Sequence, residues 1–203
     1  MRIAIDGPAA AGKTTLARAL ARELGFTFVP TGAMYRAVAL ARRRGRAEAE
    51  VTVVGDGRVL LGGEDVTDLL ASPDLDDLSS QVAVEPEVRR RLVGVQRRIA
   101  AEGSVVMEGR DIGTVVLPDA ELKIYLWATD EERARRRMAE KGGTFEEVLA
   151  AIRRRDERDS TRSDSPLRPA PDAVVLDTTG KRPEDVLELA LRLVGERCAR
   201  QAR

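Results

Sequence analysis

The sequence predicts an α/β fold, a three-layer arrangement in which helices cover both faces of a five-stranded parallel sheet. Three observations predict it. Short apolar strands alternate with helical segments along most of the chain, and a glycine-rich motif joins the first strand to the first helix. In addition, 43% of the 203 residues are hydrophobic, which is enough to bury a core in one main domain with a modest insertion.

The first part of the chain alternates strands and helices in the expected way. Residues 2–6 predict a short buried strand, and residues 14–24 carry apolar side chains at helical spacing until Gly25. Residues 26–29 predict a second strand, and residues 32–44 predict a second helix. This order is typical of a parallel sheet covered by helices.

Residues 46–75 interrupt the alternation. The apolar segments 51–54 and 58–61 flank Gly55-Asp56-Gly57, which indicates a β-hairpin with a glycine-rich turn. We therefore expect a small β-rich insert over residues 46–75. The expected core consists of the segments on either side of it, 1–45 and 76–203.

The second part of the core predicts three further strands and four further helices. The expected strands are 104–107, 121–127 and 173–176. The expected helices are 87–101, 130–140, 145–158 and 183–197. The pair Gly142-Gly143 separates two of these helices, and a proline-rich loop precedes the last strand.

The composition excludes several classes of protein. The chain has no histidine, which excludes histidine-based triads, histidine general bases and most zinc sites. Its single cysteine, Cys198, cannot form a disulfide within the chain, as is typical of the reducing cytoplasm. Basic and acidic residues number 34 each, so we expect no nucleic-acid partner. The N-terminus predicts a strand rather than a signal peptide, and no apolar run is long enough to span a membrane, so we expect no membrane partner.

One motif carries a specific chemistry. The segment Gly7-Pro8-Ala9-Ala10-Ala11-Gly12-Lys13-Thr14 matches the phosphate-binding loop, or P-loop, G-x-x-x-x-G-K-[ST] at every fixed position. Its glycines let the backbone approach phosphate oxygens, and N–H groups at the helix N-terminus supply positive potential. We expect this loop and Thr15 to bind ATP, with Lys13 reaching the β- and γ-phosphates and Thr14 binding Mg²⁺.

The P-loop alone does not define an activity, because GTPases, helicases and transport ATPases share it. A GTPase would carry an Asn-Lys-x-Asp guanine motif, which is absent from the sequence. A helicase would carry paired acids at a strand end, whereas residues 105–107 lead into Glu108-Gly109-Arg110-Asp111. Asp6, directly before the loop, is expected either to orient Lys13 or the water around a metal, or to act as a hydrogen-bonding residue at the strand end.

Four further motifs occur in order along the chain. They are Thr31-Gly32-Ala33-Met34-Tyr35-Arg36, Ser80-Gln81-Val82-Ala83 ahead of Arg89, Gly109-Arg110-Asp111-Ile112-Gly113-Thr114-Val115-Val116, and Arg155-Asp156-Glu157-Arg158-Asp159-Ser160-Thr161-Arg162. Together with residues 7–15, they resemble bacterial cytidylate kinases in order and spacing over nearly the whole chain. The last two motifs are specific to that family, whereas the P-loop is widely shared.

The resemblance implies transfer of the γ-phosphoryl group of ATP to CMP or dCMP. In the family, the arginines that match Arg36, Arg110 and Arg162 hold the acceptor's phosphate, and three guanidiniums can neutralise a dianion through forked hydrogen bonds. We expect Tyr35 to add a hydroxyl donor and Thr31 to belong to the same acceptor site.

The resemblance also implies how the nucleoside is recognised. The residues that match Ser80, Arg89 and Asp111 contact the cytosine edge, and those that match Arg155 and Asp159 contact the ribose. A carboxylate accepts from the N4 amine while arginine donates to the ring acceptors. Uracil reverses these groups, and each buried polar group left unpaired costs about 1–3 kcal/mol.

We expect in-line transfer without a strong general base, because the acceptor oxygen is already an anion. The expected catalytic residues are Lys13, Arg110 and Arg162, assisted by Mg²⁺ and by two or three arginines in or beside a helical lid over residues 137–146. The insert over 46–75 is expected in the region that binds the nucleoside monophosphate (NMP). Other basic residues beside the lid alternate with acids, so we expect most of them on salt-bridged surface helices, namely Arg133, Arg136, Arg153 and Arg154.

The sequence departs from the family pattern at Pro30, Glu108 and Trp127, where relatives often carry aspartate, and nothing in the sequence explains Trp127. Two alternatives stay open: a kinase for UMP, dTMP or shikimate on the same fold, and a non-kinase ATP-binding module. Members of the family are commonly monomers, so we expect a monomer in the cytoplasm.

Overall fold

The computed structural model describes residues 1–46, 49–72, 74–162 and 164–201. The predicted insert therefore includes residues 47, 48 and 73, which lie outside the described residues. The predicted core likewise includes residues 163, 202 and 203, which also lie outside them.

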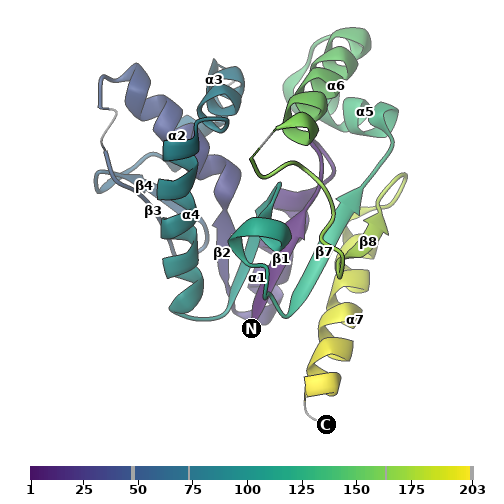
Figure 1. The fold of residues 1–203 in the computed structure, drawn as a ribbon. Helices are drawn as coiled ribbons and strands as arrows, with labels where there is room; N and C mark the ends of the chain where they lie inside the picture. The colour runs from purple at the N-terminus through teal and green to yellow at the C-terminus, as the bar shows by residue number, and fades with distance from the viewer. Residues whose placement is uncertain (47–48, 73, 163, 202–203) are drawn as a thin grey trace.

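Five parallel strands form the central sheet in the order β2-β6-β1-β7-β8, which confirms the predicted architecture (Figure 1). They are β1 (Arg2–Asp6), β2 (Thr27–Pro30), β6 (Val105–Gly109), β7 (Leu122–Trp127) and β8 (Val174–Asp177). Asp6 of β1 lies beside Gly109 of β6 and Tyr125 of β7. The carboxyl ends of these central strands therefore meet at one edge of the sheet, where α/β proteins bind ligands.

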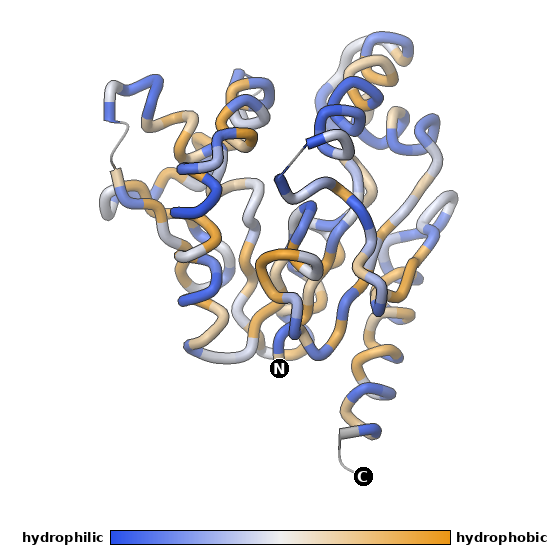
Figure 2. Tube along the Cα trace, in the orientation of Figure 1, coloured by the Kyte–Doolittle hydropathy of each residue, from blue (hydrophilic) through white to orange (hydrophobic). Residues whose placement is uncertain are grey.

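Helices cover both faces of this sheet. They are α1 (Lys13–Leu24), α2 (Thr31–Arg43), α3 (Asp74–Val82), α4 (Pro86–Ala101), α5 (Asp130–Lys141), α6 (Phe145–Thr161) and α7 (Pro183–Gln201). Ile3 and Ile5 of β1 pack in one core cluster with residues of α1 and α7, whereas Ala4 packs in a second cluster with residues of α2 and α4. Because successive side chains of β1 point to opposite faces of the sheet, this strand contributes apolar side chains to the core on each face. Figure 2 shows apolar residues along the central strands and the helices beside them.

The predicted hairpin is present as part of a three-stranded antiparallel sheet. Its strands are β3 (Val51–Val54), β4 (Arg58–Leu61) and β5 (Glu64–Asp65), followed by a 3₁₀ turn over Thr67–Ala71. Val53 and Val59 are buried in the same core cluster as α2 and α4. At the hairpin turn Gly57 has a φ of 95°, and a β-carbon there would lie 2.5 Å from the ring of Phe28, so the turn packs directly on β2.

Besides β5 and the 3₁₀ turn of the insert, two elements were not predicted from the sequence. The helix α3 has only nine residues, and it buries Leu75, Ser79 and Val82, so its periodic signal is weak. The predicted boundary between residues 75 and 76 lies inside this helix. The second missed element is a single π-helical turn over Ile112–Val116, directly after β6. No helix among the described residues combines the length and the apolar character needed to cross a membrane.

Candidate active site

A cavity of about 460 Å³ lies at the carboxyl edge of the sheet, and its lining includes residues of the P-loop, α2, α3, α5 and α6. In Figure 1, α2 and α3 lie on one side above this edge and α5 and α6 on the other. Its volume is in the range of small-molecule sites. Every residue predicted to bind the acceptor lines it, namely Thr31, Tyr35, Arg36, Ser80, Arg89, Arg110, Asp111, Arg155, Asp159 and Arg162.

The P-loop forms one wall of the cavity. Ala9, Ala10, Lys13 and Thr14 line it, whereas Thr15 faces a second hollow beside α1. Lys13 is buried, and its Nζ donates to the carbonyl oxygen of the loop residue Pro8 at 2.7 Å. Burial and the neighbouring charge of Arg110 lower the pKa of Lys13 to about 7.

The other predicted residues of the loop determine its shape. Gly7 has a φ of 149° and Gly12, at the N-terminus of α1, has a φ of 90°, and both values are in the range that favours glycine. Pro8, Ala11 and Gly12 complete the segment between β1 and α1. A strand, a tight loop and a helix N-terminus therefore follow one another, as phosphate binding requires.

Replacing Gly7 with alanine is expected to abolish measurable ATP binding and to lower the midpoint temperature of unfolding by about 10 °C or more. A β-carbon at Gly7 would lie 2.3 Å from the carbonyl oxygen of Leu126, so the loop must move away from β7. Calorimetry with ATP and a thermal scan measure the two effects. The control is Gly103→Ala, since a β-carbon there meets no atom within 4 Å; equal behaviour of the two variants would contradict this account.

The cavity contains cationic donors that have no hydrogen-bond partner among the described residues. Arg110 is held by Asp159, with its Nε 2.8 Å from Oδ2, and Arg162 donates through its Nε to the carbonyl oxygen of Asp159 at 3.3 Å. The Nε of Arg155 and one Nη of Arg162 are buried and make no hydrogen bond to any residue that the structure describes. Burial, together with the charge of Arg110, lowers the pKa of Arg155 to about 10. An anion site requires N–H donors that are free to bind it and several positive charges close together, and these arginines supply both.

Arg36 is engaged differently from the other two arginines predicted to hold phosphate. Its Nη1 donates to the carbonyl oxygen of Leu70 at 2.9 Å, and its Nη2 forms an ion pair with Asp76 of α3. Asp76 also pairs with Arg137 and Lys141 of α5. Sequence reasoning missed Asp76 and Lys141. The available signal was an acidic cluster at the start of α3, a position that favours acidic side chains.

The residues predicted to contact cytosine, Ser80, Arg89 and Asp111, all line the cavity. Arg89 and Asp111 form an ion pair with both side chains buried, and Arg89 also donates to the carbonyl oxygen of Ala83 at 3.1 Å. The Arg89 guanidinium lies 5.9 Å from the centre of the Tyr35 ring. Burial raises the pKa of Asp111 above its usual value and raises that of Tyr35 to about 12. A fixed carboxylate and guanidinium can read a base edge that offers one donor and adjacent acceptors.

Two acidic residues at strand ends have distinct tasks. The carboxylate of Asp6 accepts hydrogen bonds from the backbone N–H groups of Ile112 at 2.8 Å and Gly113 at 2.7 Å. Of its two expected roles, the structure shows the hydrogen-bonding one, which anchors the π-helical turn. Burial raises the pKa of Asp6 to about 6 despite these bonds. Glu108 accepts from the hydroxyl of Thr14 at 3.2 Å, which places a carboxylate directly beside the P-loop.

The basic residues beside the predicted lid have separate positions. Arg137 lines the cavity, whereas Arg133 donates to the carbonyl oxygens of Ala128 at 3.1 Å and of Ala9 in the P-loop at 3.0 Å. The N–H of Ala9 donates in turn to Asp156 of α6 at 3.2 Å, so both α5 and α6 are bonded to the loop.

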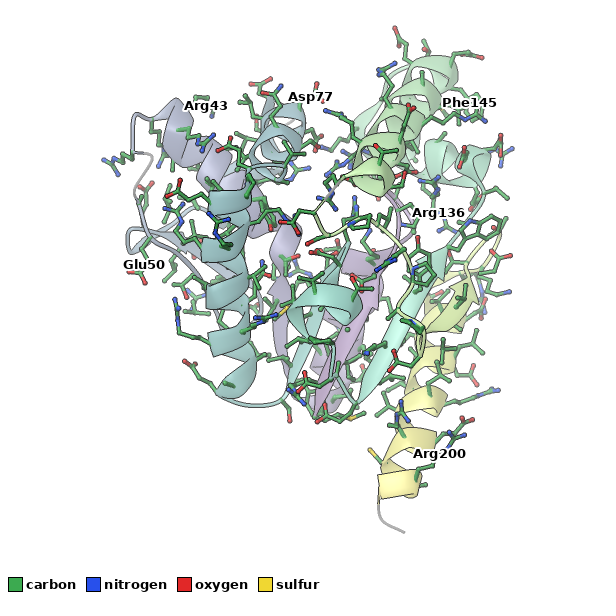
Figure 3. The ribbon with its side chains drawn as sticks, in the orientation of Figure 1. Arg43, Glu50, Asp77, Arg136, Phe145 and Arg200 are labelled. Atoms are coloured by element: carbon green, nitrogen blue, oxygen red, sulfur yellow. The ribbon has the colours of Figure 1, made fainter. Side chains whose placement is uncertain are left out.

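Two other basic residues there make contacts away from the cavity. Arg136, marked on α5 in Figure 3, donates to the hydroxyl of Thr178 at 3.1 Å. Arg153 pairs with Asp130 at 3.0 Å on the surface, as expected for a salt-bridged helix. Of the three departures from the family pattern, Pro30 lines the cavity and Trp127 is 43% exposed at the end of β7. Nothing in the structure explains the choice of tryptophan there.

Solved structures share this fold. A chain from Eubacterium ventriosum described as an uncharacterized protein aligns with a TM-score of 0.62 at 12% identity, covering 96% of this chain and 98% of that one. A gluconokinase from Sinorhizobium meliloti aligns with a TM-score of 0.56 at 13% identity, covering 100% and 97%. TT1252 from Thermus thermophilus is 28% identical with a TM-score of 0.50, covering 96% and 95%.

The parallel sheet, the P-loop after its first strand and the cationic cavity define the class of protein, a P-loop kinase for a small acceptor. A family model described as cytidylate kinase matches residues 3–196. Curated cytidylate kinases from Carboxydothermus hydrogenoformans and Thermotoga maritima are 46% and 48% identical to this chain, covering 97% of it in each case and 98% and 97% of their own lengths. The chain belongs to the cytidylate kinase family and is a nucleoside monophosphate kinase.

Proposed function

We propose that the cavity is the place where the γ-phosphoryl group of ATP passes to CMP or dCMP, giving ADP and CDP or dCDP. One observation supports this assignment above the others: a single cavity joins Lys13 of the P-loop to arginines whose buried N–H groups have no partner in the described part of the chain. Donor phosphates and an acceptor phosphate are the anions that such a cavity attracts. Family membership does not favour the alternatives, a UMP, dTMP or shikimate kinase or a non-kinase module.

On the donor side, the backbone of residues 7–15 is proposed to hold the phosphates of ATP, and Lys13 is proposed to exchange the Pro8 carbonyl oxygen for phosphate oxygens. The hydroxyl of Thr14 and the carboxylate of Glu108 form a set of hard oxygen donors that suits Mg²⁺, which takes few protein ligands and keeps nucleotide phosphates and waters. When bound, the ion would neutralise negative charge on the phosphates. Lys13 adds a preorganised charge where water is largely excluded.

On the acceptor side, Arg36, Arg110 and Arg162 are proposed to hold the phosphate of CMP, with the hydroxyl of Tyr35 as a further donor. Their charges place the nucleophilic oxygen and lower its repulsion from the donor phosphates, so positioning replaces a general base. We therefore assign Lys13, Arg110 and Arg162 as the catalytic residues.

Recognition of the nucleoside is proposed to use the residues around the buried Arg89–Asp111 pair. Ser80, Arg89 and Asp111 would contact the cytosine edge, and Arg155 and Asp159 would contact the ribose. Asp159 would serve a second purpose, since it already holds Arg110. The hydroxyl of Thr31 donates to the carbonyl oxygen of Glu108 at 2.7 Å, which joins the start of α2 to the end of β6 at the acceptor site.

The remaining proposals concern the arrangement of the chain. We propose that residues 46–75 form the small β-rich part of the NMP-binding region, with 1–45 and 76–203 as the kinase core. The lid is proposed over 137–146, which includes the turn between the end of α5 at Lys141 and the start of α6 at Phe145. We further propose a cytoplasmic monomer without a nucleic-acid partner; a mass measured by light scattering that corresponds to two chains would contradict the monomer.

A panel of acceptors tests the proposed function. We expect rapid ADP formation in a coupled assay with CMP and dCMP. With UMP or AMP we expect kcat/KM to be lower by about a hundredfold or more, because the buried groups that would pair with the cytosine edge are left unpaired. A reaction without any acceptor measures ATP hydrolysis and is expected to be slow. Turnover of another acceptor while CMP and dCMP stay unphosphorylated would refute the assignment.

A further inference from the structure

Asp76 of α3 lies at the centre of a group of four basic residues. Its Oδ1 pairs with Nη2 of Arg36 and lies 3.7 Å from Nη1 of Arg155. Its Oδ2 lies 2.8 Å from Nη2 of Arg137 and 2.7 Å from Nζ of Lys141. The two oxygens of one carboxylate therefore hold different cations. One faces α2 and α6, and the other faces α5.

These cations surround the cavity from both sides. Arg36, Arg137, Lys141 and Arg155 all line it, and they outnumber the single carboxylate that holds them together. Burial would raise the pKa of Asp76, but the hydrogen bond from Lys141 and the charges of Arg36 and Arg137 lower it below its usual value. Asp76 is therefore an anion near neutral pH, and it offsets the mutual repulsion of the four cations.

The contacts of Arg36 show what an acceptor's phosphate must displace. Both of its terminal nitrogens are used inside the protein, one by the Leu70 carbonyl oxygen and one by Asp76. In contrast, the hydrogen bonds that hold Arg110 and Arg162 use their Nε atoms. A phosphate can thus bind the terminal nitrogens of Arg110 and Arg162 without breaking those bonds. The N–H group of Arg36 that Asp76 holds becomes available to the phosphate only if Asp76 gives it up, although the guanidinium has further N–H groups to offer.

We propose that Asp76 is a positioning residue that competes with the acceptor's phosphate for Arg36 and links α3 to α5 until the acceptor binds. This inference rests on the proposed function, since it takes Arg36 as a ligand of that phosphate. The exchange replaces a monoanionic carboxylate by a dianionic phosphate among the same cations. Asp76 therefore lowers the affinity of the cavity for anions in general and favours anions with enough charge to displace its carboxylate.

Asp76→Asn removes the charge and keeps the shape of the side chain. We expect the dissociation constant for CMP, measured by calorimetry, to fall about fivefold, as expected for loss of a competing ion pair of partly exposed groups. The dissociation constant for ATP is expected to change by less than about twofold. A purely structural role for Asp76 would weaken CMP binding or leave it unchanged, and either result would overturn the proposal.

The neighbouring residue supplies a matched control. Asp77, marked on α3 in Figure 3, has a side chain that is 85% exposed and contacts Arg158 at 3.5 Å. Asp77→Asn makes the same change in charge on the same helix, and CMP binding is expected to stay as in the original protein. Asp76→Ser is a second variant without the charge; it must also tighten CMP binding, with thermal scans reporting folding of both.

A double variant separates this inference from the proposed function. Arg36→Gln alone is expected to weaken CMP binding by about tenfold or more, and no loss would refute the proposed role of Arg36. If that loss is seen, Asp76→Asn is then made in the Arg36→Gln background, where it is expected to have no effect on CMP. An equal gain in both backgrounds would mean that general charge attraction, rather than release of Arg36, causes it, and the competition would be refuted.

Discussion

Replacing Lys13 with methionine is expected to lower kcat/KM for phosphoryl transfer to CMP by about a thousandfold or more. The ammonium group is buried on the wall of the cavity, where its charge acts in a medium of low polarity. Methionine keeps much of the volume of the side chain but supplies no charge to the phosphate oxygens. Coupled detection of ADP at CMP concentrations well below KM measures the loss.

The same variant is expected to fold at least as well as the original protein. Burial holds the pKa of Lys13 at about 7, so the charged form is already costly to the folded state. A thermal scan should therefore show no lower midpoint for Lys13→Met, which separates loss of chemistry from loss of structure. Lys181→Met, at an exposed lysine before α7, is the control and should leave activity unchanged. A loss below about tenfold at Lys13 would contradict the assigned role.

Asp111→Asn is expected to lower kcat/KM for CMP by about a hundredfold or more while the affinity for ATP stays nearly constant. Asp111 forms a buried pair with Arg89, and both residues line the cavity and are assigned to the base. Loss of the carboxylate removes the acceptor proposed for the cytosine amine. It also leaves a buried guanidinium without its counter-charge, so the free energy of unfolding is expected to fall by about 3 kcal/mol.

A second substitution distinguishes these two effects. In Arg89→Met with Asp111→Asn both charges are gone, and the free energy of unfolding should recover most of the loss. Turnover of CMP should stay low, because the groups proposed to read the base are still missing. Urea titration and the coupled assay measure the two quantities on the same samples. Recovery of CMP turnover in the double variant, or equal losses in CMP turnover and ATP binding for Asp111→Asn, would contradict the base-reading role.

The sequence was sufficient for the features that depend on local pattern. The P-loop, its strand and its helix follow one another within a short segment, so residues 2–24 could be predicted almost without tertiary information. The hairpin around Gly55-Asp56-Gly57 has the same local character, and the remaining strands could be predicted from their apolar composition. In contrast, residues as distant as Arg36 and Arg162 could be assigned to one cavity only through the motifs shared with a family.

The features that could not be predicted depend on packing between distant segments. The helix α3 offers only three buried positions, too few for a clear periodic signal. The ion pairs of Asp76 join residues from α2, α5 and α6, and no spacing in the sequence marks them as neighbours. The same applies to Asp6, whose partners belong to a π-helical turn more than 100 residues away.

Two hydrogen bonds to backbone atoms of Ala9 connect α5 and α6 to the P-loop. Arg133 of α5 is attached to the carbonyl oxygen of this residue, and Asp156 of α6 is attached to its N–H. Both attachments use main-chain atoms, so the side chain at residue 9 does not carry them. Both helices are therefore fixed to the P-loop at one residue. Any displacement of α5 and α6 from the P-loop must either break these two hydrogen bonds or displace residue 9 with the helices.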